Sequence, residues 1–120
     1  MIDAMLLKLL QEIDPNTYNK YNETELTEFS YFDDYGRMTE YAYADDLIES
    51  ANIAWLQAVL QEEIIKHGWA ITLTYNPPNG CNAPYWSTHI WKDDHREASS
   101  KAYSLIDSLL ASYISAIEGN

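Results

Sequence analysis

Residues 44–68, ADDLIESANIAWLQAVLQEEIIKHG, decide the fold of this 120-residue chain. An acidic pair opens the stretch, where the unpaired N–H groups of a helix start favour carboxylates. Gly68 closes it, where a helix favours a left-handed residue. Between them apolar residues occupy more than one helical face, which is typical of a helix buried on two sides. The stretch therefore predicts a central core helix, with buried side chains that include Trp55, Leu56 and Val59.

The residues before this helix divide into two segments. Residues 1–14 place apolar side chains at helical spacing and predict a short amphipathic helix, which ends at the turn formers Asp14 and Pro15. Residues 15–43 are acidic and rich in tyrosine, without a clear period. We predict an irregular segment there with one or two short strands. The aromatic residues argue against disorder, because disordered acidic segments are poor in aromatic residues.

The residues after the helix predict a hairpin and a last helix. Residues 69–92 contain two runs that alternate between apolar and polar residues around a loop rich in proline and asparagine, as in an antiparallel hairpin. Residues 93–118 place apolar residues from Ala98 to Ile117 on one helical stripe and serines on the other side. The sequence thus predicts a single α+β domain over residues 1–120, in which two long helices and a short N-terminal helix pack on a small antiparallel sheet.

The charge of the chain is large and unevenly distributed. Nineteen acidic residues oppose seven basic ones, for a net charge of −12, and residues 12–63 hold 13 of the acids with only Lys20 and Arg37. Such a chain repels nucleic acids and anionic membranes and attracts basic proteins. No segment resembles a signal peptide or membrane span, and the single Cys81 suits a reducing compartment. We expect a cytoplasmic protein, monomeric or homodimeric, that binds neither nucleic acid nor membrane directly.

Residues with catalytic or metal-binding chemistry are few. The histidines and Cys81 lack the tight spacing of zinc ligands, and no serine has a nucleophile motif around it. We therefore expect no catalytic residue, metal or cofactor. One alternative is a small metal-dependent hydrolase built on the corner of Asp93, Asp94 and His95.

Residues 68–120 combine a Trp-bearing strand, a loop rich in Gly, Asn and Pro, a second aromatic strand and the Ser/Ala-rich ASSKAYSLIDSLLASYISAI. This order resembles small phage and prophage proteins of the phage ABA sandwich type, which have no established catalytic residues to carry over. The acidity also resembles phage inhibitors of host defence, the anti-CRISPR and anti-restriction proteins. The resemblance implies an accessory protein that acts inside an infected host cell.

These observations predict a non-enzymatic binding protein whose acidic first half contacts a basic, nucleic-acid-handling host protein, such as a defence nuclease. Its sharpest form is an inhibitor that imitates nucleic acid. An alternative is a structural or assembly accessory protein of a phage. The predicted contact residues combine carboxylates that attract the partner with tyrosines that anchor it. They are Glu23, Glu25, Glu28, Asp33, Asp34, Glu40, Tyr31, Tyr35 and Tyr41.

Overall fold

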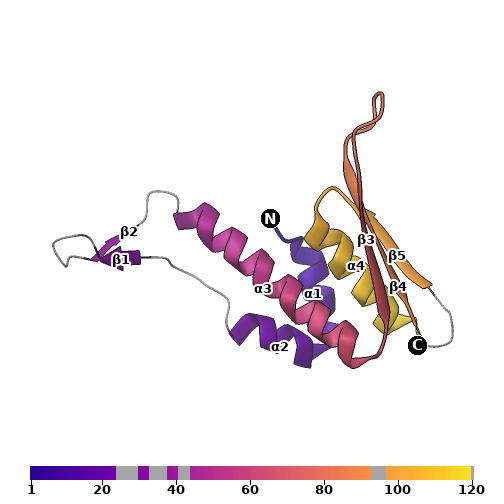
Figure 1. Cartoon of the computed structure of the whole chain (residues 1–120). Helices are drawn as coiled ribbons and strands as arrows, with labels where there is room; N and C mark the ends of the chain where they lie inside the picture. The colour runs from indigo at the N-terminus through magenta and orange to yellow at the C-terminus, as the bar shows by residue number, and fades with distance from the viewer. Residues whose placement is uncertain (24–29, 33–37, 41–43, 93–96, 120) are drawn as a thin grey trace.

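The structure, a computed structural model, describes residues 1–23, 30–32, 38–40, 44–92 and 97–119. Within them the chain forms four helices and five strands (Figure 1). In chain order they are α1 (Ala4–Ile13), α2 (Pro15–Glu23), β1 (Ser30–Phe32), β2 (Met38–Glu40), α3 (Ala44–Lys66), β3 (Ala70–Asn76), β4 (Tyr85–Trp91), β5 (Glu97–Ala102) and α4 (Leu105–Glu118). The α+β class with an antiparallel sheet is confirmed, whereas the prediction of three helices is wrong.

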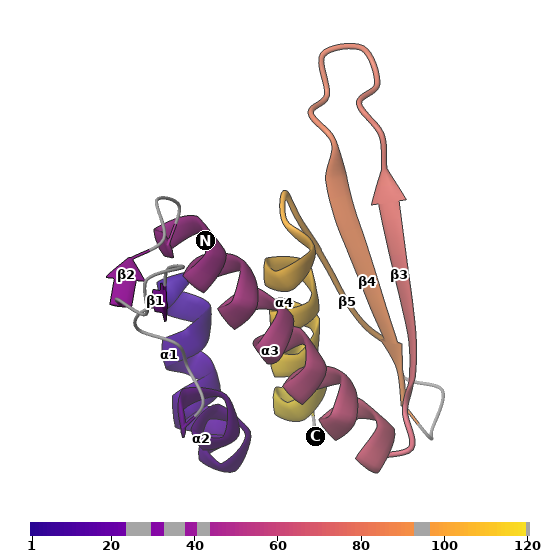
Figure 2. The same cartoon turned by 60° about the vertical axis from the view of Figure 1, so that its left-hand side comes forward.

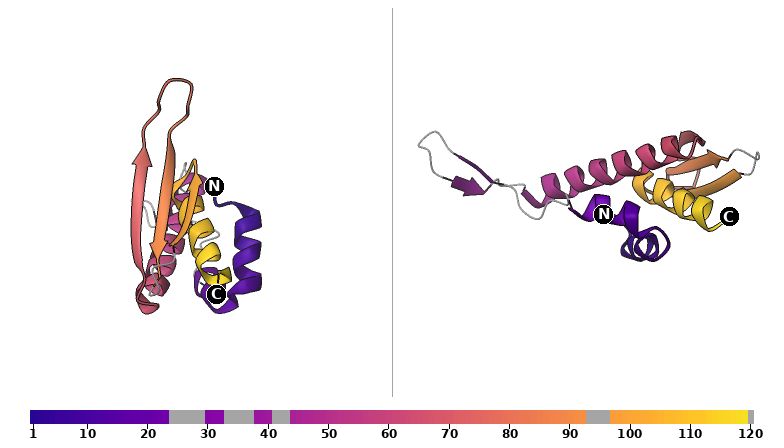
Figure 3. Two further views of the ribbon diagram at one scale, coloured as in Figure 1. Left: turned by 90° about the vertical axis from the view of Figure 1, so that its right-hand side faces the viewer. Right: turned by 90° about the horizontal axis from the view of Figure 1, so that it is seen from below.

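The most enclosed helix is α4, and not α3 as the sequence suggested. One side of α4 packs on β4 and β5, and its other sides contact α1 and α3 (Figures 1 and 3). Leu109, Leu110 and Tyr113 of α4 are fully buried. The helix therefore lies between the sheet and the other helices, and it forms the centre of the hydrophobic core.

Two serines of α4, Ser108 and Ser112, face the sheet rather than solvent, which contradicts the prediction. Ser108 and Ser112 are fully buried. The hydroxyl of Ser108 lies 2.8 Å from that of Thr88 and donates to the carbonyl of Ser100 at 3.1 Å, while Ser112 donates to the carbonyl of Thr88 at 3.1 Å. A buried hydroxyl is tolerated when it has a hydrogen-bond partner, and the small serine side chain allows the helix to pack closely on the sheet. Serine at these positions is therefore compatible with burial.

The last helix begins at Leu105, because residues 97–102 form a third strand. Strand β5 pairs antiparallel with β4, and the helix starts after Ser104, whose hydroxyl accepts from the N–H of Asp107 at 3.2 Å. The prediction of a helix from residue 93 is wrong over these residues. The spacing of Ala98 and Ala102 fits one helical stripe and also one strand face. Pairing with the open edge of β4 selects the strand.

A second short helix follows α1 with only Asp14 between them. Asp14 accepts hydrogen bonds from the N–H of Thr17 at 3.4 Å and from its hydroxyl at 2.7 Å, as the N-cap of α2. Pro15 occupies the first helical position, where its missing N–H costs nothing. The prediction of an irregular segment is therefore wrong over residues 15–23, because Asp14 and Pro15 form a cap followed by a new helix and not a turn.

Helix α3 has the predicted extent. Gly68 has a φ of 74°, and the N–H of Trp69 donates to the carbonyl of Ile64 at 3.2 Å, which forms a Schellman motif. Leu56 and Val59 are buried as predicted. Trp55 is 38% exposed, contrary to the prediction, because it covers the side of α2, where its indole N–H donates to the carbonyl of Lys20 at 3.3 Å.

The predicted hairpin of residues 69–92 is present as β3 and β4, in a sheet of order β3-β4-β5. Its tip extends beyond the helices (Figures 1 and 2). The face toward α4 carries apolar side chains, among them Ile71 and Ile90, that pack in the core. Thr72 and Thr74 on the opposite face are exposed, so the sheet is covered on one side only by the described residues.

A partly buried hydrogen bond joins α4 to the junction of α1 and α2. The hydroxyl of Tyr113 donates to Asp14 Oδ2 at 2.5 Å. Burial raises the pKa of Tyr113 well above its ordinary value, and the hydrogen bond to Asp14 raises it further. The folded state therefore holds the phenolic proton more tightly than the unfolded state does, so this stabilisation is complete below about pH 10 and is lost above it.

Replacing Tyr113 by phenylalanine should lower the free energy of unfolding by about 1.5–3 kcal/mol near pH 7, since a hydrogen bond to a carboxylate is lost. Denaturant unfolding at about pH 7 and about pH 11 should show that the difference from wild type shrinks at the higher pH. Tyr103→Phe is the matched control, because Tyr103 is 82% exposed. An equal loss in both variants, or a difference that grows with pH, would contradict the assignment.

Candidate functional site

The predicted contact residues lie between the end of α2 and the start of α3. Glu23 is the exposed last residue of α2. Tyr31 lies in β1 and Glu40 in β2, and these strands form a separate two-stranded sheet in which Ser30 is opposite Glu40 and Tyr31 is opposite Thr39. The predicted short strands are thus present. The remaining predicted contact residues lie outside the described residues: Glu25, Glu28, Asp33, Asp34, Tyr35 and Tyr41.

One acid of the first half is neutralised inside the fold. Glu63 of α3 forms ion pairs with Lys20 of α2 and, at 3.4 Å, with Lys66. Partial burial pushes the pKa of Glu63 upward, but the hydrogen bond and charge of Lys20, helped by Lys66, outweigh it and hold the pKa below its ordinary value. The same contact, formed chiefly through the hydrogen bond to Glu63, raises the pKa of Lys20 to about 12. The ion pair of Lys20 and Glu63 therefore links α2 to α3.

Two further acids of residues 12–63 also have structural partners. Asp14 caps α2 and accepts from Tyr113, and Glu49 pairs with the N-terminal ammonium at 2.5 Å. Among the acids of this range with described side chains, Glu12 and Glu23 are exposed and form no ion pair with the described residues. Glu23 lies at the start of the acidic segment, and the sequence places seven further acids in residues 24–46 that follow it.

The alternative hydrolase corner of Asp93, Asp94 and His95 lies outside the described residues. In the part of the chain that the structure describes, no three His, Cys, Asp or Glu residues gather as metal ligands would. His67 instead stacks on Trp69, with ring centroids 4.1 Å apart, and His89 pairs with Glu97. His67 thus packs against an aromatic ring, and His89 links β4 to β5.

Cys81 lies at the hairpin tip and is exposed. Its neighbour Gly80 has a φ of 59°, and backbone hydrogen bonds between Asn79 and Asn82 close the turn around them. Because the thiol has no packing role, Cys81→Ser should change the free energy of unfolding by less than about 0.5 kcal/mol. Thermal unfolding measures this, and a markedly lower melting temperature would show an unrecognised role of the thiol.

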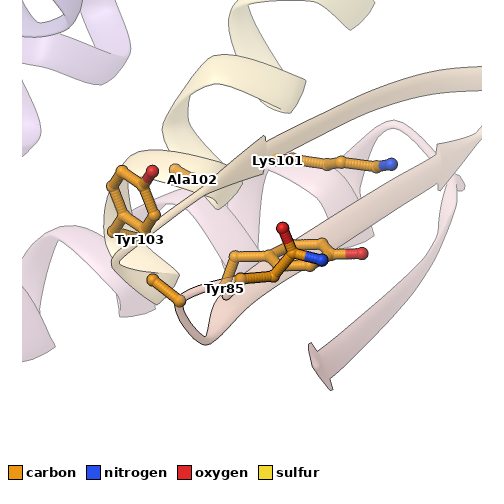
Figure 4. A pocket seen from close by; sticks show the side chains of 6 residues that line it. Tyr85, Lys101, Ala102 and Tyr103 are labelled. Atoms are coloured by element: carbon orange, nitrogen blue, oxygen red, sulfur yellow. The ribbon is translucent and has the colours of Figure 1, made fainter. Parts of the chain in front are cut away.

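Sequence reasoning missed a pocket of 540 Å³ between the hairpin and β5 (Figure 4). The ammonium of Lys101 lies 5.6 Å from the ring centroid of Tyr85, and Tyr103 is 82% exposed beside them. No carboxylate of the described residues pairs with Lys101. The sequence predicts a strand at Tyr85 but a helix over Lys101, Ala102 and Tyr103, and no local signal distinguishes EASSKA as a strand, so the pattern does not bring these side chains together. The pocket offers aromatic faces and one cation, without an arranged acid, base or nucleophile.

No protein-family model matches the chain, and no curated protein or solved structure shows significant similarity to it. Among the described residues, no helix has the length and hydrophobicity needed to cross a membrane.

Proposed function

We propose that this chain is a non-enzymatic binding protein whose acidic, tyrosine-rich segment between α2 and α3 contacts a basic surface of another protein. The distribution of charge carries the proposal: residues 12–63 hold 13 acids and two bases, and one of those bases, Lys20, is paired with Glu63 inside the fold. An acidic surface of this kind steers a basic partner into contact.

The arrangement of the fold supports this proposal. The sheet of β1 and β2 is separate from the three-stranded sheet, and Figure 1 places it beyond the N-terminal end of α3. The hydrophobic core among described residues is built from the four helices and the three-stranded sheet. A contact segment carried beside such a core can meet a partner without loss of the packing that holds the fold together.

The partner class follows from the chemistry of the surface. Duplex DNA carries one charge per about 1.7 Å of its axis, so the basic grooves that bind it also attract a dense set of carboxylates. A nucleic-acid-handling protein of a host cell, such as a defence nuclease, presents such a groove. In this proposal the chain inhibits or modulates that protein by occupying the groove in place of nucleic acid.

The test is capture of a partner from host lysate on the immobilised chain, followed by measurement of binding to the purified partner. We expect binding to weaken steeply between about 50 and about 500 mM salt, because exposed charges are screened. Duplex DNA or RNA should compete for the same partner surface. Salt-insensitive binding would contradict the acidic contact, and salt-sensitive binding without competition would retain the contact but overturn the mimicry.

A further inference from the structure

Strand β3 presents an open sheet edge. The sheet order is β3-β4-β5, so β3 is hydrogen-bonded on one side only among the described strands. Figures 2 and 3 show β3 as the outermost strand, with no described element along its free side. Alternate N–H and C=O groups along such an edge are available to a further strand.

The sequence of β3 lacks the features that usually protect an edge from pairing. Its seven residues, AITLTYN, contain no charged residue and no proline. The opposite edge, β5, carries Glu97 and Lys101. Natural edge strands are commonly protected by charges, prolines or bulges, because an open and uncharged edge recruits another strand. Pro77 and Pro78 follow β3 immediately and limit any pairing to its seven residues.

Strand β3 is self-complementary in antiparallel pairing. When a second copy is placed about a two-fold axis at Leu73, Ile71 is opposite Tyr75 of that copy, and Thr72 is opposite Thr74. The pair of Ile71 and Tyr75 joins two apolar side chains on the face of the sheet toward the core. Tyr75 is 50% exposed in the single chain, so pairing would cover part of its surface. The second joins two exposed threonines, a favourable cross-strand pair.

Charge also favours a second copy at this edge. The chain has a net charge of −12, so most contacts between two copies bring carboxylates together. At β3 no charged residue of one strand faces one of the other. Long-range repulsion between the two chains remains, and it is screened by salt.

We propose that the chain forms a symmetric homodimer in which the β3 strands of two copies pair antiparallel about Leu73 and join their sheets into one of six strands. Two seven-residue strands form about six to eight backbone hydrogen bonds. The strand pair alone gives an interface of about 1,000 Å², at the low end for specific complexes, and we expect a dissociation constant in the micromolar range.

Sedimentation equilibrium of the full chain between about 1 and about 300 μM tests the dimer. Dimerisation should tighten as salt rises, opposite to the binding of a basic partner, so the two proposals fail independently. The variant T72K/T74K places four lysines together across the axis and should weaken association at least about 100-fold. T72K/T74E places each lysine opposite a glutamate of the other copy and should restore it.

The control is Ser99→Lys, which adds a charge to the same sheet face at β5 and should leave the dimer intact. Ser99, Thr72 and Thr74 are all exposed, so the variants should fold, and circular dichroism checks this. A monomer at every concentration overturns the proposal, as does a dimer insensitive to T72K/T74K. If T72K/T74K disrupts the dimer and T72K/T74E does not restore it, the strands do not pair in the register centred on Leu73.

Discussion

Replacing Leu56 by alanine should lower the free energy of unfolding by about 2–5 kcal/mol, the range for a buried leucine that leaves a cavity. Leu56 is fully buried on α3 and belongs to the core that α4 shares. Since small domains are stable by only about 5–15 kcal/mol, this single change should shift the unfolding transition strongly. Denaturant unfolding at equilibrium measures the difference.

The neighbouring Trp55 provides the matched comparison. Its side chain is larger, and the sequence alone predicts a cost of about 3–5 kcal/mol for Trp55→Ala if the ring were buried. Because the residue is 38% exposed and packs against one side of α2, we expect a clearly smaller loss than for Leu56→Ala. An equal or greater loss for Trp55→Ala would mean that the packing of α2 on α3 differs from that in the structure.

Helix α3 could be predicted from sequence because its signals are local. Acids at its start, apolar residues on successive turns and Gly68 at its end act within a few residues of one another. Leu56 and Trp55 show where local pattern stops being informative. Both lie on apolar faces, and tertiary packing decides that Leu56 is buried in the core while Trp55, beside α2, is partly exposed.

Strand β5 could not be predicted for a related reason. Its residues EASSKA have weak strand propensity, and the spacing of its alanines fits a helix as well. The strand forms because β4 offers hydrogen bonds along its second edge. Ser108 and Ser112 became buried as a consequence, since they pack against the sheet that β5 completes.

The candidate contact segment was identified by composition, and composition does not distinguish acids available to a partner from acids used inside the fold. Glu63 and Asp14 belong to the same acidic half, yet one fastens α2 to α3 and the other binds Tyr113. Only tertiary structure shows that these two charges are committed, because their partners lie far away in sequence. Glu23 remains exposed at the entrance to the segment.

Neutralising the charges of this segment should slow association with the basic partner by about tenfold at low salt, because carboxylates steer the encounter. Two triple variants test it, each measured by stopped-flow or surface-based kinetics. The first changes the glutamates at residues 23, 25 and 28 to glutamine, and the second changes Asp33, Asp34 and Glu40 to their amides. Release should change little, and the effect should disappear near about 0.5 M salt.

The matched control removes the same charge elsewhere. Glu12, Glu62 and Glu118 are exposed and lie outside the segment, so their change to glutamine alters the net charge equally and should slow association much less. The tyrosines act at short range, so Tyr31→Ala, Tyr35→Ala or Tyr41→Ala should instead speed release, by about 30-fold for a true anchor. If the control slows association as much as the segment variants do, then net charge attracts the partner and the segment is not the contact surface. Unchanged release in all three tyrosine variants would remove the tyrosines from the interface while leaving the charges in it.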